Sequence, residues 1–211
     1  MTTTIRLRWT GRGSPARNRP PSSGRDAILY YFGLVIVGAI LVHAIPEMQT
    51  VLLSAVRDAL SAQTGTLAAA AKAYATGNIL HAAAVTFCVN FFMGTLLMIT
   101  LPSMLVPGSG ILLATLRSFL WGLLLAPTMG LLALTMIPHS GTLLLEGEGY
   151  ILATIFGLSI PIHMFQSSLG GNPFSRFGRA ILLNVQASFW VALVLVAAAC
   201  YEATEVIAMM R

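Results

Sequence analysis

Residues 137–158 read IPHSGTLLLEGEGYILATIFGL, and they place His139, Glu146 and Glu148 within an apolar part of the chain. A carboxylate in such a stretch must either face water or be satisfied by protein groups. In a membrane protein, an ionisable side chain at such a position is a candidate functional site. The rest of the sequence decides whether these residues lie in a membrane.

The composition indicates a membrane protein. Hydrophobic residues make up 56% of the 211 residues and charged residues 9%, against about 25% charged in an ordinary soluble domain. A spanning helix needs about 20 mostly apolar residues. The stretches of this kind are residues 27–46, 80–102, 111–137, 142–165 and 180–203. We therefore predict an all-α polytopic transmembrane helical bundle of about five spans, formed by residues 27–211.

The net charge of +5 lies in residues 1–26, which hold six arginines and one acid, whereas six basic and six acidic residues cancel in the remaining chain. An arginine-rich segment before a first span is the positive-inside signal, and it can also touch anionic lipid headgroups. We therefore expect a disordered basic arm in the cytoplasm, an N-terminus inside and a multi-pass protein of the inner (plasma) membrane. This explanation argues against nucleic acid as a partner.

Residues 47–79 form the only substantial loop between the predicted spans. Apolar residues recur with helical periodicity in its first half, and its second half is rich in alanine, a strong helix former. We predict an outer helical loop that is broken at Gly65. This loop either covers the outer face of the bundle or docks a partner.

The third predicted span, residues 111–137, is long and contains Pro127, which lacks the N–H that would continue a helix. The favoured interpretation is one tilted and kinked span, because a single proline is a tolerated kink. The alternative is a broken element of two half-helices, 111–126 and 128–137, as found around transport sites. Arg117 is placed so that its side chain can extend to the cytoplasmic interface.

Small residues recur every fourth position in two places. The first stripe is Gly122, Ala126 and Gly130, and the second stripe is Gly149, Ala153 and Gly157. Such spacing lets helix backbones approach closely within lipid. We predict that spans three and four pack against each other through these stripes, or that the stripes hold a partner subunit, including a second copy of the chain. Glu146 shares a helix face with the second stripe and is expected to point at a neighbouring helix.

Under the predicted topology, ionisable residues gather at the outer ends of the spans. This candidate cluster consists of His43, Glu47, His81, His139 and Glu146. Three interpretations are open: separate interfacial side chains, a proton-sensitive hydrogen-bonded cluster, or a divalent metal site. The sequence contains no HExxH, CxxC, GxSxG or P-loop motif, so we predict neither catalytic residues, enzymatic activity nor a cofactor.

At these residues the chain resembles the stage II sporulation protein M family of integral membrane proteins. Members show a Pro-His-Gly sequence, a glutamate and then an apolar helix with small residues. The matching positions are Pro138, His139, Glu146, Ala153, Gly157 and Leu158. Asn90 and Gly94 resemble a second family stretch, an asparagine-containing helix with a following glycine. The chain departs from the pattern at Ser140, which replaces the glycine, and in a wider separation between the histidine and the glutamate.

The resemblance implies a non-enzymatic membrane scaffold or assembly protein that organises other membrane or envelope proteins. The alternative is a small permease or channel component with a polar path near Glu146 and Arg117. A scaffold predicts that Glu146 packs against another helix without a continuous cavity. A permease predicts a cavity that reaches both Glu146 and Arg117.

Overall fold

The computed structural model describes residues 23–128, 130–165 and 172–210. Within these ranges every regular element is a helix, which confirms the all-α class. The helices are α1 (Ser23–Ala44), α2 (Pro46–Ser61), α3 (Thr66–Ala75), α4 (Ile79–Cys88), the π-helix η1 (Val89–Thr100), α5 (Leu101–Leu105), α6 (Ser109–Leu125), α7 (Gly130–Phe165) and α8 (Pro173–Met209). Residues 1–22 of the predicted arm lie outside the described residues, and residues 23–26 already belong to α1.

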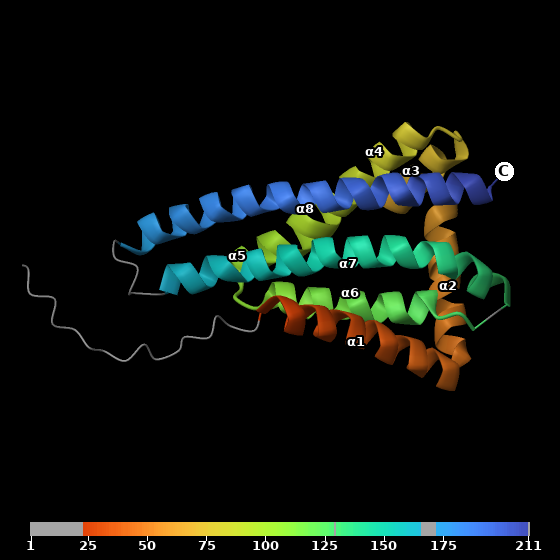
Figure 1. Ribbon diagram of the computed structural model, residues 1–211, viewed down its shortest axis with the longest axis horizontal. Coiled ribbons are helices and arrows are strands. Elements are labelled where there is room, and N and C mark those ends of the chain that lie inside the picture. Colours follow the sequence, from red (N-terminus) through yellow and green to blue (C-terminus); the bar gives the residue numbers. More distant parts are fainter. Residues whose placement is uncertain (1–22, 129, 166–171, 211) are drawn as a thin grey trace, which may run out of the picture.

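The long helices pack lengthwise into a bundle. Helix α7 contacts α8 most extensively, α1 packs against α6, and α4 packs against α8. Figure 1 shows α7 and α8 side by side with α6 and α1 on the other side of α7, while α2 crosses one end of the bundle. We call this end the cap end and refer to α2 and α3 as the cap helices.

Among the described residues, four helical segments are long and apolar enough to cross a membrane. These segments are Gly24–Ala44, Ile79–Leu105, Pro138–Phe165 and Pro173–Met209. Helix α6 is apolar but shorter, with 17 residues, and it covers the first part of the third predicted span, residues 111–137. At 1.5 Å per residue the 37 residues of α8 extend about 55 Å, well beyond a hydrocarbon core of about 30 Å. Helix α8 is therefore long enough to extend past the lipid.

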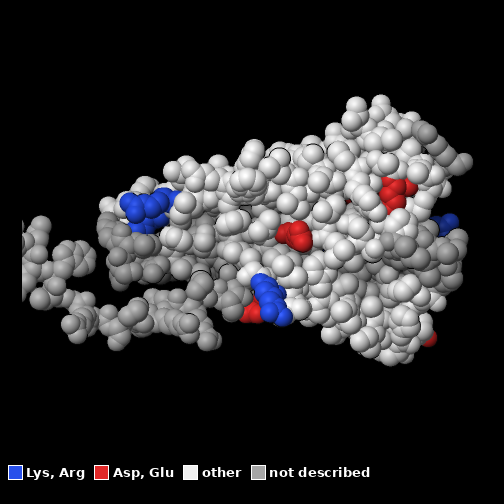
Figure 2. Space-filling model, in the orientation of Figure 1, with Lys and Arg blue, Asp and Glu red and all other residues white. Residues whose placement is uncertain are grey.

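The bundle surface suits a lipid environment. Many large apolar side chains are exposed, including Ile36 and Ile40 of α1, Leu112 of α6, and Phe189 and Trp190 of α8. On the face shown in Figure 2, charged residues form only a few small, separate patches among uncharged residues. Exposure of so much apolar surface to water is unfavourable, so these observations support the predicted transmembrane bundle.

The predicted kinked third span is wrong, because the helix breaks. Helix α6 ends at Leu125, residues 126–128 are not helical, and α7 begins at Gly130. The backbone of Ala126 is extended (φ −59°, ψ 128°), as the steric demand of Pro127 favours. The side-chain amide of Gln49 donates hydrogen bonds to the carbonyls of Leu124 (3.0 Å) and Ala126 (2.8 Å). A cap helix thus satisfies carbonyl groups that the break leaves free.

The outer loop forms two helices that meet at Gly65, as predicted. Gly65 adopts a φ of +110°, a conformation that a residue with a side chain rarely takes. The helices pack onto the bundle, since α2 contacts α6 and Gln49 is only 2% exposed. The loop thus covers the cap end of the bundle.

Residues 138–141 separate two predicted spans, but the structure has no gap there, because Pro138 lies inside the continuous helix α7. The hydroxyl of Tyr201 donates to the carbonyl of Pro138 at 3.0 Å, so α8 supports α7 at this position. The start of α7 carries His139 toward α8, where its Nδ1 lies 3.6 Å from Oε1 of Glu205.

The first small-residue stripe makes a different contact from the predicted one. A Cβ atom on Gly122 would lie 2.1 Å from the carbonyl oxygen of Val35, and a Cβ atom on Gly38 would lie 2.5 Å from that of Phe119. These paired glycines let α1 and α6 approach closely, instead of joining spans three and four. Ala126 is buried in the break after α6. Gly130 begins α7, and its packing lies outside the description.

The second stripe lies in the core, on the buried face of α7. A Cβ atom on Gly149 would meet Leu195 of α8 at 2.8 Å, and one on Gly157 would meet the Ser103 hydroxyl oxygen of α5 at 3.2 Å. Ala153 is 3% exposed and belongs to the central hydrophobic cluster. The second stripe therefore packs α7 against α8 and α5.

Candidate functional site

Polar side chains from four helices meet inside the bundle. The polar centre, as we call it, consists of Asn90 of η1, Arg117 of α6, Glu146 and Tyr150 of α7, and Glu202 of α8. Glu146 is 3% exposed and Tyr150 is fully buried. The prediction that Glu146 points at a neighbouring helix is confirmed, since the side-chain amide of Asn90 donates a hydrogen bond to Oε1 of Glu146.

Arg117 points into the bundle and not toward a membrane surface. Its Nη2 donates to the hydroxyl of Tyr150 at 2.7 Å, and its guanidinium lies 3.9 Å from the centre of the Tyr150 ring. It also lies 5.8 Å from the ring of Trp121, one turn along α6. These contacts stabilise a buried cation through its hydrogen bond and through the negative faces of two aromatic rings.

The sequence builds this arrangement through spacing and small residues. Glu146 and Tyr150 are four residues apart, so they share one face of α7. Gly94 makes room for the tyrosine, because a Cβ atom there would lie 2.9 Å from the Tyr150 hydroxyl oxygen. Asn90 and Gly94 both belong to η1, and π-helical turns are rare and are often found at functional sites.

Glu202 brings a second carboxyl group to the centre. It lines the same cavity as Glu146 and as Tyr74, which belongs to the cap helix α3. The Tyr74 hydroxyl also lies 2.8 Å from the hydroxyl of Thr86. Burial raises the pKa of Tyr74, and the negative charge of Glu202 raises this pKa further. Tyr74 therefore stays a neutral hydroxyl that can donate to the carboxylate.

A cavity lies between the polar centre and the cap helices. Its volume is about 310 Å³, and its lining includes Tyr74 from α3, Asn90 from η1, Arg117 from α6, Glu146 from α7 and Glu202 from α8. The cavity thus reaches both Glu146 and Arg117, the two residues that the permease hypothesis places along a polar path. We call it the polar cavity.

An apolar cavity of about 440 Å³ adjoins the polar cavity. The two share part of their lining, namely Leu67, Gly94, Met98, Arg117 and Trp121. The apolar cavity continues between α2, η1 and α6, where leucines such as Leu53 and Leu120 line it. Together the two cavities offer a charged end and a hydrophobic end under the cap helices.

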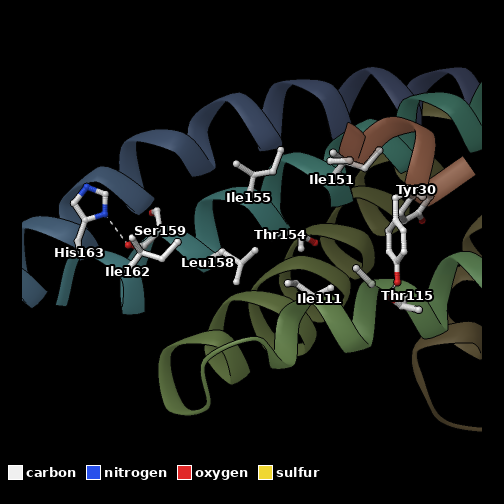
Figure 3. Close-up of a pocket in the computed structure, with 13 residues that line it drawn as sticks. Tyr30, Ile111, Thr115, Ile151, Thr154, Ile155, Leu158, Ser159, Ile162 and His163 are labelled. Atoms are coloured by element: carbon white, nitrogen blue, oxygen red, sulfur yellow. Dashed lines mark hydrogen bonds between the residues drawn. The ribbon is translucent and has the colours of Figure 1, made fainter. Parts of the chain in front are cut away.

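A larger groove, about 540 Å³, lies elsewhere in the bundle, between α1, α6 and α7. Figure 3 shows Ile111 of α6 and Ile151 and Ile155 of α7 along this groove, with His163 hydrogen-bonded to the carbonyl of Ser159 (2.7 Å) at one end. Its walls are mainly aliphatic, and no glutamate or arginine lines it. The groove therefore suits apolar chains and lacks the chemistry of the polar centre.

The predicted cluster of histidines and glutamates does not converge. His43, Glu47 and His81 are all exposed at the cap end. His43 bonds its own helix, with Nδ1 2.8 Å from the carbonyl of Ala39. Among the residues described, no group of three or more His, Cys, Asp or Glu side chains is placed to hold a metal ion. The members of the cluster come from four helices, α1, α2, α4 and α7, and only Glu146 of α7 reaches the polar centre.

Two members of that cluster do form important contacts, each with a different partner. Glu146 joins the polar centre, whereas His139 pairs with Glu205, whose other carboxyl oxygen accepts a hydrogen bond from the Thr142 hydroxyl at 3.3 Å. Both partners, Glu202 and Glu205, come from α8.

Sequence reasoning missed Tyr150, Glu202 and Tyr74 as site residues. The signal for Tyr150 was its position one turn after Glu146 on the same face. The signal for Glu202 was a single acid near the end of the apolar residues 180–203. No pattern in the sequence indicates that Tyr74, in the outer loop, reaches the bundle interior.

The fold and the site define a class: an integral membrane helical bundle with a buried, charged centre beside an internal cavity. Comparison of the chain with protein-family models, curated proteins and solved structures finds no match in any of the three. A function for this chain must therefore be argued from the site itself.

Proposed function

We propose that this protein is a small membrane permease or channel component that takes up its solute in the polar cavity. The observation that carries the proposal is the cavity of about 310 Å³ that reaches both Glu146 and Arg117. In a transmembrane bundle, buried ionisable groups that face such a cavity are typical of a solute or ion pathway.

The break between α6 and α7 supports the same proposal. Transport sites are commonly built from interrupted helices, because irregular backbone is tolerated inside a membrane only where protein or a cavity satisfies it. Here Gln49 of a cap helix satisfies the broken end of α6. The adjoining apolar cavity favours a small solute with both a polar and an apolar part.

The orientation is part of the proposal. The arginine-rich residues 1–26 precede α1, and Arg176 and Arg179 lie in the first turns of α8. By the positive-inside rule both segments belong in the cytoplasm of a cell bounded by an inner (plasma) membrane. The cap end and the polar cavity then face outward.

A scaffold that organises other envelope proteins is the second candidate. One observation favours it: residues from both stretches of the family resemblance meet, as Asn90 bonds Glu146. The polar centre would then serve to hold η1 against α7, and the stage II sporulation protein M resemblance would extend to this chain. Partners would bind the exposed apolar faces or the cap helices.

A liposome swelling assay tests the permease proposal. The purified protein is reconstituted, and swelling is followed by light scattering with a panel of small amines, amino acids and alcohols. We expect faster swelling than in protein-free liposomes for at least one solute. Ala70→Trp, which fills the polar cavity from α3, should remove this effect, whereas Ala69→Trp on the exposed side of α3 should retain it.

The opposite result favours the scaffold. If no solute enters faster than in protein-free liposomes, and gentle detergent extraction recovers the protein in a stable complex with other envelope proteins, the permease proposal fails. Recovery of the protein alone, together with solute entry that only Ala70→Trp blocks, would exclude the scaffold.

A further inference from the structure

The carboxyl groups of Glu146 and Glu202 pose a chemical problem that the protein groups around them do not solve. Oε1 of Glu146 accepts a hydrogen bond from Asn90, but the buried Oε2 has no hydrogen-bond donor. The second carboxyl group that lines the polar cavity is that of Glu202 from α8, and it acts on Glu146. Two ionised carboxylates have only acceptor atoms, so they repel each other and cannot form a hydrogen bond.

The other groups that face Glu146 leave this excess of negative charge in place. From α6, Arg117 supplies one positive charge, but its hydrogen bond goes to Tyr150 of α7. From α1, Tyr31 is a buried neutral hydroxyl near both Arg117 and Glu146. Tyr74 of α3 and Asn90 of η1 are also neutral. On the other side of the pair, Glu202 is also faced by His139 of α7 and Glu205 of α8, which pair with each other at 3.6 Å. The carboxyl groups of Glu146 and Glu202 thus have one guanidinium, that of Arg117, between them.

We infer that Glu146 and Glu202 together bind a single exchangeable proton, which is the coupling ion of the proposed permease. The role of the proton as a coupling ion rests on the proposed function, whereas the binding of the proton to the two carboxyl groups does not. A proton fits this site better than a metal ion, because Oε2 of Glu146 is buried without a donor and no group of three or more His, Cys, Asp or Glu side chains in the described part of the chain is placed to hold a metal. A shared proton supplies the missing donor and reduces the charge of the pair to −1, which Arg117 balances.

The structure also provides a path by which this proton exchanges. Glu202 is only half-buried, and both it and Glu146 line the polar cavity. Tyr74 lines the same cavity. A proton can therefore reach Glu202 from the cavity and pass to the buried Glu146. A solute in the same cavity would contact Glu146 and Glu202 directly. Binding of the solute and release of the proton are linked in this way.

Infrared spectroscopy of the protein in lipid nanodiscs tests the shared proton without any transport. The C=O stretch of a protonated carboxyl group at neutral pH should be present in the wild type and should shift in D₂O. Glu146→Gln and Glu202→Gln should each abolish the band, because the new amide donates to the remaining carboxylate and replaces the proton. Glu148→Gln, at an exposed position of the same helix, is the matched control and should leave the band unchanged.

Three results would overturn the inference. The wild type could lack the band, or Glu202→Gln could retain it, as it would if burial alone kept Glu146 protonated. The band could also survive both substitutions and therefore arise elsewhere. If Glu146→Gln does not fold, as judged by circular dichroism, Glu202→Gln decides the question alone, and Glu202→Asp should restore the band.

Transport then separates this inference from the proposed function. If the infrared result holds and no solute enters liposomes, the permease proposal fails and the proton site remains. If solute enters independently of an imposed pH gradient and the band is absent, the proton site fails and the permease remains.

Discussion

At the level of single residues, Asn90 has the clearest structural role. It donates to a carboxylate that is almost completely buried and whose second oxygen has no donor. Removing the amide would leave Glu146 with no hydrogen-bond donor among the contacts described. A buried acceptor without a donor is costly, because folding removes it from water without compensation.

We therefore expect Asn90→Leu to lower the free energy of unfolding by about 1 to 3 kcal/mol. Thermal unfolding in detergent, compared with the wild type, measures this loss. Gln186→Leu changes an amide to the same apolar side chain at an exposed position of α8 and should have a much smaller effect. Equal stability of the Asn90 variant and the wild type would show that the hydrogen bond contributes nothing.

At the level of helices, close approach and interruption shape the bundle. The glycines of α1 and α6 bring the two backbones together, and helix packing in lipid depends on such contacts. The break after α6 is stabilised by one glutamine from α2. Both features involve elements distant in sequence.

Gly122→Ala should be strongly destabilising, because its Cβ atom would lie 2.1 Å from a backbone oxygen of α1, which cannot rotate away. We expect a loss of at least about 1 to 3 kcal/mol, measured by thermal unfolding. Gly33→Ala on α1, where a Cβ atom meets nothing within 4 Å, is the matched control. A similar midpoint for both variants would contradict the close packing of α1 and α6.

Gln49→Leu should loosen the end of α6, because the carbonyls of Leu124 and Ala126 lose their donor. We expect a loss of about 1 to 3 kcal/mol and faster amide hydrogen exchange in residues 46–61 and 120–125. The neighbouring variant Thr50→Ala, at an exposed position, should show neither change. Unchanged exchange in Gln49→Leu would show that the cap helix does not hold this break.

At the level of the whole molecule, the two ends of the bundle differ in what they carry. The bundle places the cap helices, the polar cavity and the end of α8 at one end, as Figure 1 shows for the helices. The basic residues at the start of α8 lie a helix length of about 50 Å away. Orientation therefore decides which compartment the cavity serves.

Cysteine labelling tests the proposed orientation. With the two exposed cysteines replaced (Cys88→Ser and Cys200→Ser), a cysteine is introduced at Gln63 in the cap or at Ser175 at the start of α8. We expect a membrane-impermeant maleimide to label Gln63→Cys in intact cells, and Ser175→Cys only after permeabilisation. The reverse pattern would place the cap and the polar cavity on the cytoplasmic side.

The sequence by itself determined the class of the protein and the buried face of α7. The chain has few charged residues and several long apolar stretches, and in lipid such stretches satisfy their backbone hydrogen bonds as helices. The spacing of Glu146, Gly149 and Ala153 then determines which face of α7 is buried. The break at Gly65 was also predictable, because glycine is the residue that tolerates its backbone conformation.

Only the tertiary structure decided what Glu146 meets. Asn90, Arg117 and Glu202 lie far from it in sequence, and no periodicity specifies which helices are neighbours. The same limit explains the two errors in helix boundaries, since a break after α6 is stable only with Gln49 in place and Pro138 is held in α7 by contact with α8. Packing between distant elements, which local sequence does not encode, created both the polar centre and the cavity beside it.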